Sequence, residues 1–442
     1  MHKMIKEVYE SVRKFVKTLE NEKEKYVHNP KIDFTRLRKI SFSDCILSVC
    51  CMSGGTLFSE LLEYYQDSEN LPSVSALLQQ RSKLKYHAFE DFFKLTVSLN
   101  QTHQFYQGYR LLAVDGSDIQ IPLNSKDEDT FFSGTNGQKP YNLVHLNTMY
   151  DILSNSYLDE VVQDRKNWAE HEALNQMVDR SDIGLALVMA DRGYESYNVM
   201  AHIQEKGWKY LLRVKDLSGN GIVSRLQLPQ DPCFDMDIDL QITRKLSNET
   251  KRLFLDRNHY RYTPPNSKFD YLPPHSKYKE DAVFYRLPFR VVRFEIAENQ
   301  YETLLTNLDR DSFPADELKR LYAMRWGVET SFRTLKYNVG LIYFHSWKKN
   351  LVMQELFARL AMYNITSAIA ADTTPSETEK LYAYKINSAQ AVIICRKLFL
   401  NRISPHLAEK LLSRSVVPVR VNRTFRRKNP ARIAINFIYR IA

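Results

Sequence analysis

The spacing of apolar residues changes several times along the chain and divides it into regions. Residues 1–105 place apolar positions at helical intervals, as in LPSVSALLQQRSKLKYHAFEDFFKLT. From about residue 109, short apolar runs that predict strands are joined by helical patterns, in the order β-β-β-α-β-α-β up to residue 215. This order predicts a mixed β-sheet covered by helices.

The second half of the chain breaks this rhythm and then returns to it. Residues 216–300 are rich in Pro, Tyr and Phe and alternate apolar and polar positions, as in DMDIDLQITRK, which predicts a β-rich insertion. The expected regions are a helical, candidate DNA-binding region (1–105), the two parts of an α/β core (106–215 and 301–372), the insertion between them (216–300), and a basic helical region for DNA binding or dimerisation (373–442). For residues 1–105, plain helical packing is the alternative interpretation.

One long helix is predicted over ADELKRLYAMRWGVETSFRTLKYNVG, residues 315–340. Its apolar face is flanked by a polar stripe that spans roughly 60° at about 100° per residue. The stripe consists of Tyr322, Arg325, Glu329 and Lys336, with Arg333 beside it. A carboxylate among cations and a phenol at the edge of a buried face suggests a site.

The formal net charge of +10 is unevenly distributed along the chain. From Leu381 onward there are 13 Lys and Arg residues and one acid, Glu409, so the first 380 residues sum to −2. Such a basic segment fits a polyanionic partner such as nucleic acid, or a basic face with no specific partner. No apolar run approaches the ~18 residues that a membrane span requires, and five cysteines without metal-ligand spacing favour reduced thiols in a cytoplasm.

Two aspartates follow apolar runs that are predicted to be strands: Asp115 after LLAV and Asp191 after LALVMA. Ligands of α/β proteins commonly bind where strands end at their carboxyl edge. Taken singly, Asp115-Gly116 can be a turn, Asp191 a helix cap, and Glu329 a partner of surface arginines. Taken together, three acids from different elements are what two Mg²⁺ ions need in phosphodiester chemistry.

These motifs resemble the DDE transposases of bacterial insertion sequences. The matching residues are V-D115-G-S, A-D191-R-G-Y and Y322-x2-R325-x3-E329-x6-K336, the last being the signature of the branch called insertion sequence family four. TNL at 306–308 and LLQQRSKL near residue 80 also resemble the family. The resemblance implies an α/β fold: an RNase H-like mixed-sheet catalytic core interrupted by the β-rich insertion, with helical N-terminal and basic C-terminal regions.

The resemblance also implies a function. Asp115, Asp191 and Glu329 would be the catalytic residues and would bind two Mg²⁺ ions, for which Mn²⁺ may substitute, with no other cofactor. DNA phosphates would be held by Tyr322, Arg325 and Lys336, with Arg192 and Arg333 as further contacts. The expected activity is cleavage of the element's ends and joining to target DNA through a hairpin. The expected partners are double-stranded DNA (terminal inverted repeats and target) and a second copy of the chain in a synaptic homodimer. We expect a bacterial cytoplasmic protein, nucleoid-associated when bound to DNA, without membrane contact.

Three alternatives stay open: a catalytically inactive or domesticated DNA-binding protein, another RNase H-like nuclease, and a helical scaffold with a basic tail. The hairpin step has less support than cleavage. In hairpin-forming relatives a tryptophan of the insertion can stack on a flipped base, whereas Trp168, Trp208, Trp326 and Trp347 all lie outside 216–300. Tyr260, Tyr262, Phe269 and Tyr271 could replace it or could be core residues.

Overall fold

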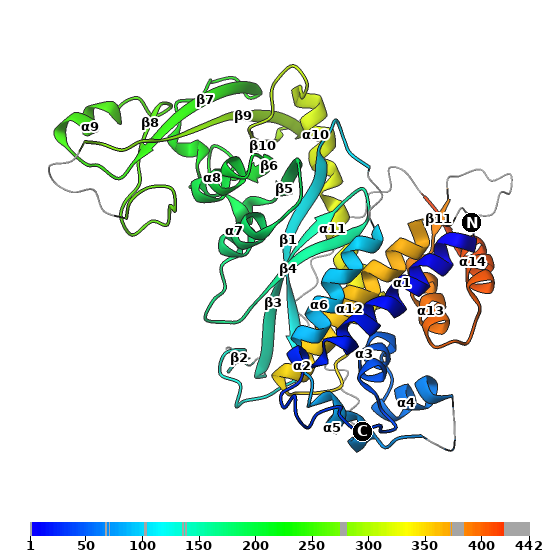
Figure 1. The fold of residues 1–442 in the computed structure, drawn as a ribbon. Helices are drawn as coiled ribbons and strands as arrows, with labels where there is room; N and C mark the ends of the chain where they lie inside the picture. The colour runs from blue at the N-terminus through cyan, green and yellow to red at the C-terminus, as the bar shows by residue number, and fades with distance from the viewer. Residues whose placement is uncertain are drawn as a thin grey trace.

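A helical body is built from the N-terminal residues and one long central helix. The computed structural model describes residues 2–66, 69, 71–100, 104–134, 137, 139–274, 281–371, 373 and 384–419. The N-terminal helices are α1 (His2–Asn21), α2 (Lys23–Tyr26), α3 (Phe42–Cys51), α4 (Leu57–Tyr65), α5 (Val74–Arg81) and α6 (His87–Val97), followed by the 3₁₀ turn η1 (Ser98–Asn100). They pack around α12 (Lys349–Ala371), which lies among α1, α3 and α6 in Figure 1.

The helix α12 is buried on all sides, with 18 of its 23 residues inaccessible to solvent. A helix buried all round must also pair the polar groups that it carries inside. The guanidinium of Arg81 on α5 donates to the Glu355 carboxylate at 2.9 Å, and Arg359 donates to backbone carbonyls of α3 and the residues after it. Buried ion pairs therefore fix how the N-terminal helices dock on α12.

The remaining core is one mixed sheet of ten strands in the order β2-β3-β1-β5-β6-β10-β9-β7-β8, with β4 paired to β3. Its first half comprises β1 (Arg110–Ile121), β2 (Phe131–Phe132), β3 (Tyr141–Asp151), β4 (Ser156–Gln163), β5 (Ala186–Ala190) and β6 (Lys209–Val214). Strands β1, β5 and β6 run parallel, and β3 pairs antiparallel with β1. The expected mixed sheet with helices on its faces is confirmed.

The period-2 pattern of the central strands buries both faces of the sheet. On one face Leu112, Val188 and Leu212 pack with the crossover helices α7 (Glu170–Arg180) and α8 (Tyr197–Glu205). On the other face Leu111 and Leu187 pack with α10 (Ala315–Met324). This double burial explains why β5 reads as a continuous apolar run.

Residues 216–300 extend the same sheet instead of forming a separate one. They contain the turn η3 (Val223–Arg225), β7 (Phe234–Thr243), the short helix α9 (Asn248–Leu253), β8 (Tyr260–Tyr262) and β9 (Tyr285–Ala297), which pairs with β10 (Gln300–Thr306). The alternation in β7 buries Ile238, Leu240 and Ile242. Figure 1 shows these strands projecting away from the helical body as an arm.

Residues 315–338 are helical apart from a turn at Arg325, and they do not form the uniform helix that the sequence predicts over 315–340. α10 ends at Met324, α11 (Trp326–Arg333) follows after Arg325, and a π-helical turn covers Thr334–Asn338. π-helical turns are rare and frequently mark functional sites. Here the wider turn changes the angular position of Lys336, so the polar stripe does not follow one 3.6-residue period.

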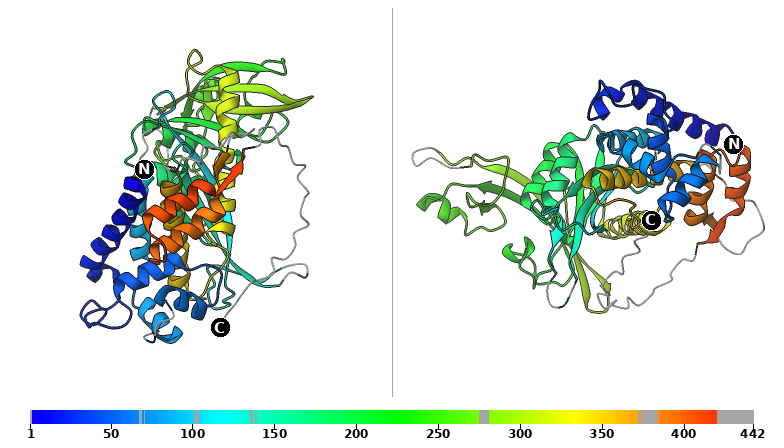
Figure 2. Two further views of the ribbon diagram at one scale, coloured as in Figure 1. Left: turned by 90° about the vertical axis from the view of Figure 1, so that its right-hand side faces the viewer. Right: turned by 90° about the horizontal axis from the view of Figure 1, so that it is seen from below.

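The described part of the C-terminal region consists of β11 (Tyr384–Ile386), α13 (Ser388–Phe399), α14 (Pro405–Arg414) and β12 (Val416–Pro418). These elements lie beside α1 and α12 in both views of Figure 2. The rest of the basic segment, residues 420–442, lies outside the described residues.

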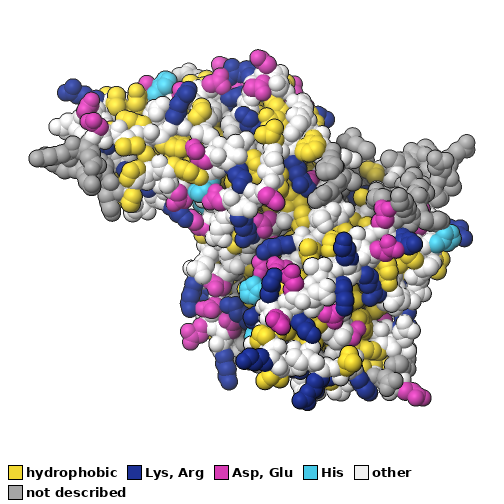
Figure 3. Space-filling view, viewed as in Figure 1, with side chains coloured by type: hydrophobic (Ala, Val, Ile, Leu, Met, Phe, Trp, Pro, Cys, Tyr) yellow, Lys and Arg dark blue, Asp and Glu magenta, His cyan; other side chains and the backbone are white. Residues whose placement is uncertain are grey.

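Among the residues that the structure describes, no helix combines the length and the apolar character of a membrane span. All five cysteines are free, and only Cys233 is exposed. Cationic and anionic side chains are interspersed over the face shown in Figure 3. The described body thus has the mixed surface that its near-neutral charge predicts.

Candidate active site

The sequence predicts that Asp115 lies at the end of a strand. In the structure it lies in the middle of β1. β1 continues to Ile121 because its outer edge stays paired with β3, where Asp115 lies opposite Thr148. Its other edge pairs with β5 only as far as Ala113 opposite Met189. The two central strands separate beyond this pair, and Asp115 lies just past the point of separation.

Asp191 follows β5 directly, as expected, and lies two residues beyond Met189 just as Asp115 lies two residues beyond Ala113. It also acts as a cap: its Oδ1 accepts a hydrogen bond from the Gly193 N–H at 2.8 Å at the start of the 3₁₀ turn η2 (Arg192–Tyr194). The cap that Asp191 forms is therefore compatible with its predicted role as a metal ligand.

Glu329 reaches the same region from α11, which packs against β1. Its carboxylate accepts a hydrogen bond from Nη2 of Arg325 at 2.9 Å. The arginine side chain is 5% exposed and that of Glu329 is 34% exposed. The arginine of this pair is buried and the glutamate is partly exposed, so it is not an ordinary surface ion pair.

The pKa of Asp115 indicates that the carboxylates of Asp191 and Glu329 lie close to it. Burial, chiefly, and the carboxylates of Asp191 and Glu329 together raise the pKa of Asp115 to about 7 against the opposing effect of Arg325. Like charges disfavour ionisation only when they lie near each other. A carboxyl group whose pKa is raised to about 7 by burial and by neighbouring carboxylates marks a candidate functional site.

The three acids offer only oxygen ligands from three separate elements, the donor set that Mg²⁺ or Mn²⁺ prefers. Within the described residues, however, no group of three or more His, Cys, Asp or Glu side chains is arranged to hold a metal ion. One oxygen of each acid accepts a hydrogen bond instead: from Gly116 N–H, Gly193 N–H and the Arg325 guanidinium, respectively. The donor chemistry of these three acids fits a divalent cation.

Residues of the helical signature surround Asp115 on the side of α10 and α11. The Tyr322 hydroxyl and the Arg325 Nε are buried and make no hydrogen bond of normal geometry with described residues. Arg325 lies over the Tyr322 ring at 5.5 Å, and Lys336 Nζ donates to the Asp118 carbonyl at 2.9 Å. Buried donors without partners are costly, so this cluster is suited to an anion that would satisfy them.

Arg192 and Arg333 are exposed, and neither forms an ion pair with an acid in the described part of the chain. Arg192 lies near enough to Glu302 to lower the pKa of that carboxyl, which burial otherwise raises. Arg333 contributes to none of the electrostatics described for Asp115. The structure therefore brings Arg325 and Lys336 close to the acids, places Tyr322 against Arg325, and leaves Arg333 apart.

The aromatic residues proposed for base stacking have different environments. Phe269 is buried in the core and packs edge-on against Tyr271 and Tyr285. Tyr260 and Tyr262 of β8 are only half-buried. Phe269 is therefore a structural residue, and the two tyrosines of β8 stay candidates.

A histidine and a fourth acid, which the sequence did not indicate, lie beside Asp115 and Asp191. His145 of β3 bonds Asp118 at 2.7 Å and Glu170 at 3.1 Å. Burial would lower its pKa, but the two carboxylates outweigh burial and raise the pKa of His145 to about 9. Only the packing of α7 against β3 brings these residues together, so no local sequence signal could reveal them.

This His145–Glu170 pair explains the glycines that follow the two aspartates. A Cβ at Gly116 would collide with the His145 ring, and one at Gly193 would come within 2.5 Å of a Glu170 oxygen. The close approach of the His145 ring thus favours glycine at position 116, whereas a Cβ at position 193 would require the Glu170 carboxylate to move.

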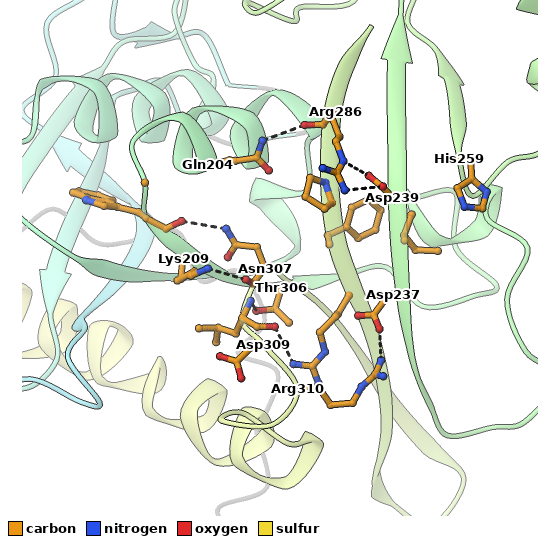
Figure 4. Close-up of a pocket in the computed structure, with 17 residues that line it drawn as sticks. Gln204, Lys209, Asp237, Asp239, His259, Arg286, Thr306, Asn307, Asp309 and Arg310 are labelled. Atoms are coloured by element: carbon orange, nitrogen blue, oxygen red, sulfur yellow. Dashed lines mark hydrogen bonds and ion pairs between the residues drawn. The ribbon is translucent and has the colours of Figure 1, made fainter.

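The cavity drawn in Figure 4, of about 690 Å³, lies elsewhere, between the start of β6, the end of β10 and the strands β7 and β9. Its three arginines are already neutralised: Arg286 pairs with Asp239 and Arg310 with Asp237, both at 2.8 Å, and Arg290 pairs with Asp235 at 2.6 Å. This balance leaves little charge for a phosphate, and the cavity adds nothing to the site at Asp115.

Comparison with known proteins identifies similar transposases. The chain is 24% identical over 305 residues to the transposase InsG for insertion sequence element IS4 of Escherichia coli (strain K12); the alignment covers 67% of this chain and 61% of that relative. It is also similar to the piggyBac transposase in a cryo-EM structure of the synaptic complex with hairpin DNA. The TM-score is 0.42 and the identity 9%, over 95% of this chain and 84% of that one.

A family described as "Transposase DDE domain" matches residues 106–365, which is more than half of the chain and includes Asp115, Asp191 and Glu329. The chain belongs to this family of transposase DDE domain proteins.

Proposed function

We propose that this protein is a DNA transposase that cleaves the ends of an insertion sequence and joins them to target DNA. The proposal rests chiefly on one observation: the buried carboxyl of Asp115 is surrounded by Asp191, Glu329 and Arg325, which come from distant parts of the chain. A purely DNA-binding protein gains nothing from three acids facing a phosphate, because they repel it. Metal-assisted phosphodiester chemistry requires them.

In this proposal Asp115, Asp191 and Glu329 hold two divalent cations, Mg²⁺ or Mn²⁺. Such ions, when bound, activate an attacking hydroxyl and stabilise the leaving oxygen of a phosphodiester. Arg325 releases Glu329 and, with Tyr322 and Lys336, holds the DNA phosphate at the cut. The buried polar atoms of Tyr322 and Arg325 would thereby gain the partners that they lack.

The finer parts of the proposal rest on the resemblance to transposases of insertion sequence family four. The core is RNase H-like, with residues 216–300 as its insertion. The freed 3′-hydroxyl attacks the opposite strand to form a hairpin and later attacks the target. A homodimer brings two ends together in the bacterial cytoplasm, at the nucleoid. The N-terminal helices and the basic C-terminal region supply further DNA contacts.

Cleavage of duplex DNA carrying the inverted repeats that flank the gene tests this function. Asp191→Asn and Glu329→Gln should each reduce Mg²⁺-dependent cleavage by at least 100-fold and leave DNA binding within about threefold of wild type. Asp231→Asn, which changes an exposed acid of the insertion, is the matched control and should cleave normally. Wild-type protein that binds these ends and never cuts them would support the inactive-binder alternative instead. Strand transfer from pre-cut ends separates a transposase from a nuclease, which cuts without joining.

A further inference from the structure

A second cavity lies beside the candidate active site, next to Asp191 and Arg192. Unlike the cavity in Figure 4, it is cationic. Its volume is about 350 Å³. Four cationic side chains line it: Arg192 of η2, Lys215 after β6, Arg225 of η3 and Arg261 of β8. The cavity thus joins the residue next to Asp191 with the loop after β6 and with the 216–300 segment.

The one carboxylate that lines this cavity is already engaged. Glu195 accepts hydrogen bonds from the backbone N–H groups of Lys215, at 2.9 Å, and of Ile222. These bonds hold the loop after β6 in place, and the single carboxylate of Glu195 leaves an excess of cationic side chains around the cavity. Within the described part of the chain, none of the four cationic side chains forms an ion pair.

Two residues that line the cavity each carry a buried polar atom that has no hydrogen-bond partner among the described residues. These atoms are the hydroxyl of Tyr197, near the start of α8, and Nε2 of His171, near the start of α7. Arg225 lies near enough to Arg261 to lower the pKa of Arg261, in addition to the effect of burial. The buried polar atoms of Tyr197 and His171 cost stability as long as they lack a partner. Arg192, Lys215 and Arg225 are exposed and Arg261 is half-buried, so four cations face one cavity with a single carboxylate among its described lining residues.

We propose that this cavity binds a backbone phosphate of DNA adjacent to the phosphate at the candidate active site. The inference rests on the proposed function and adds a second phosphate site to it. A phosphate offers several acceptor oxygens and a negative charge, which would satisfy Tyr197, His171 and the guanidinium groups together. The contrast with the neutralised cavity of Figure 4 supports this assignment.

The bound strand has two possible sources, the element end with its flanking DNA and the target duplex. Both present the same phosphodiester, and the position next to Asp191 suits either one. Cleavage of uncut ends and strand transfer from pre-cut ends distinguish them.

The test compares the double variant Arg225→Gln/Arg261→Gln with Arg252→Gln/Arg257→Gln, which removes the same charge from exposed positions in the same segment. Inorganic phosphate should raise the melting temperature of wild type and of the control, and should have a clearly smaller effect on the cavity variant. Without phosphate, the cavity variant should melt at or above the wild-type temperature, because two mutually repelling cations are gone.

DNA binding measured against salt concentration gives a second readout. Each lost phosphate contact lowers the slope of log K against log salt by about 0.9. The cavity variant should lose about 0.9 unit of slope, for one phosphate, and about tenfold in affinity relative to the control. Loss of end cleavage assigns the site to the element end, and loss of strand transfer alone assigns it to the target.

Equal phosphate stabilisation and equal salt slopes in the two double variants would overturn the inference. Should Arg225→Gln/Arg261→Gln fold poorly, Lys215→Gln/Arg225→Gln gives the same test, because both of these side chains are exposed. If wild-type protein cuts no DNA, the proposed function fails, whereas the phosphate-dependent melting shift still decides whether the cavity is an anion site.

Discussion

At the scale of single residues, Asp115 combines a role in the candidate site with a cost to stability. Its raised pKa of about 7 means that the folded protein binds a proton there more tightly than the unfolded chain. Ionising this carboxyl therefore destabilises the fold as the pH rises from the unfolded value near 3.8 to about 7. The linkage amounts to at most about 4 kcal/mol, from three pKa units at about 1.4 kcal/mol each.

We therefore expect Asp115→Asn to be more stable than wild type at pH 8 in the presence of a chelator, with little difference at pH 4.5. Urea unfolding of both proteins at the two pH values measures this. Adding Mg²⁺ at pH 8 should stabilise wild type and not the variant, because only the carboxylate binds the ion. If the free energies of unfolding of the two proteins change in parallel with pH, the pKa of Asp115 is not raised in the folded protein.

The same scale shows what the sequence could reveal about the site. The sequence predicted that Asp191 follows a strand, because an apolar run precedes it. It also predicted that Glu329 lies on a helix, because a polar stripe with helical spacing contains it. His145 and Glu170 were not predictable, since their proximity depends on how α7 packs against β3. Nor did the sequence show that Asp115 lies inside a strand, because the pairing partner Thr148 is 33 residues away.

At the scale of elements, periodic patterns predicted the helices and the central strands well. Two features escaped because tertiary packing decides them. The π-helical turn at Thr334–Asn338 interrupts a sequence with strong helical periodicity. The strands of residues 216–300 continue the central sheet, which alternation alone cannot reveal.

The helix α12 gives the element-scale prediction. Arg81 and Glu355 form an ion pair that is 0% and 1% exposed, and Arg81 and His345 hold the pKa of Glu355 at about 2 against burial. Arg81→Ala leaves Glu355 buried with less compensation, which should lower the free energy of unfolding by about 3–5 kcal/mol. Urea unfolding measures this change.

The exposed Arg36→Ala is the matched control for the same charge removal and should change stability by less than about 0.5 kcal/mol. Equal unfolding midpoints for the two variants would show that the helical body does not depend on this pair.

At the scale of the whole molecule, charge separates a balanced body from a basic C-terminal end. Cationic and anionic side chains alternate over the face in Figure 3, whereas residues 420–442 contain seven Lys and Arg residues and no acid. A balanced body contributes little long-range attraction to DNA. Non-specific affinity should therefore depend strongly on the C-terminal end, and choice of the cut site on the candidate active site.

Replacing all seven C-terminal cations with glutamine preserves length and tests this division directly. If these residues contact phosphates, the slope of log K against log salt should fall by up to about 6 units, at about 0.9 per contact, and affinity should fall by orders of magnitude at 0.2 M salt. Mg²⁺-dependent stabilisation at pH 8 should not change, since it depends on Asp115, Asp191 and Glu329. An unchanged salt slope would mean that the basic end has no DNA partner, and that binding depends instead on the cavity at Arg225 and Arg261 and on the N-terminal helices.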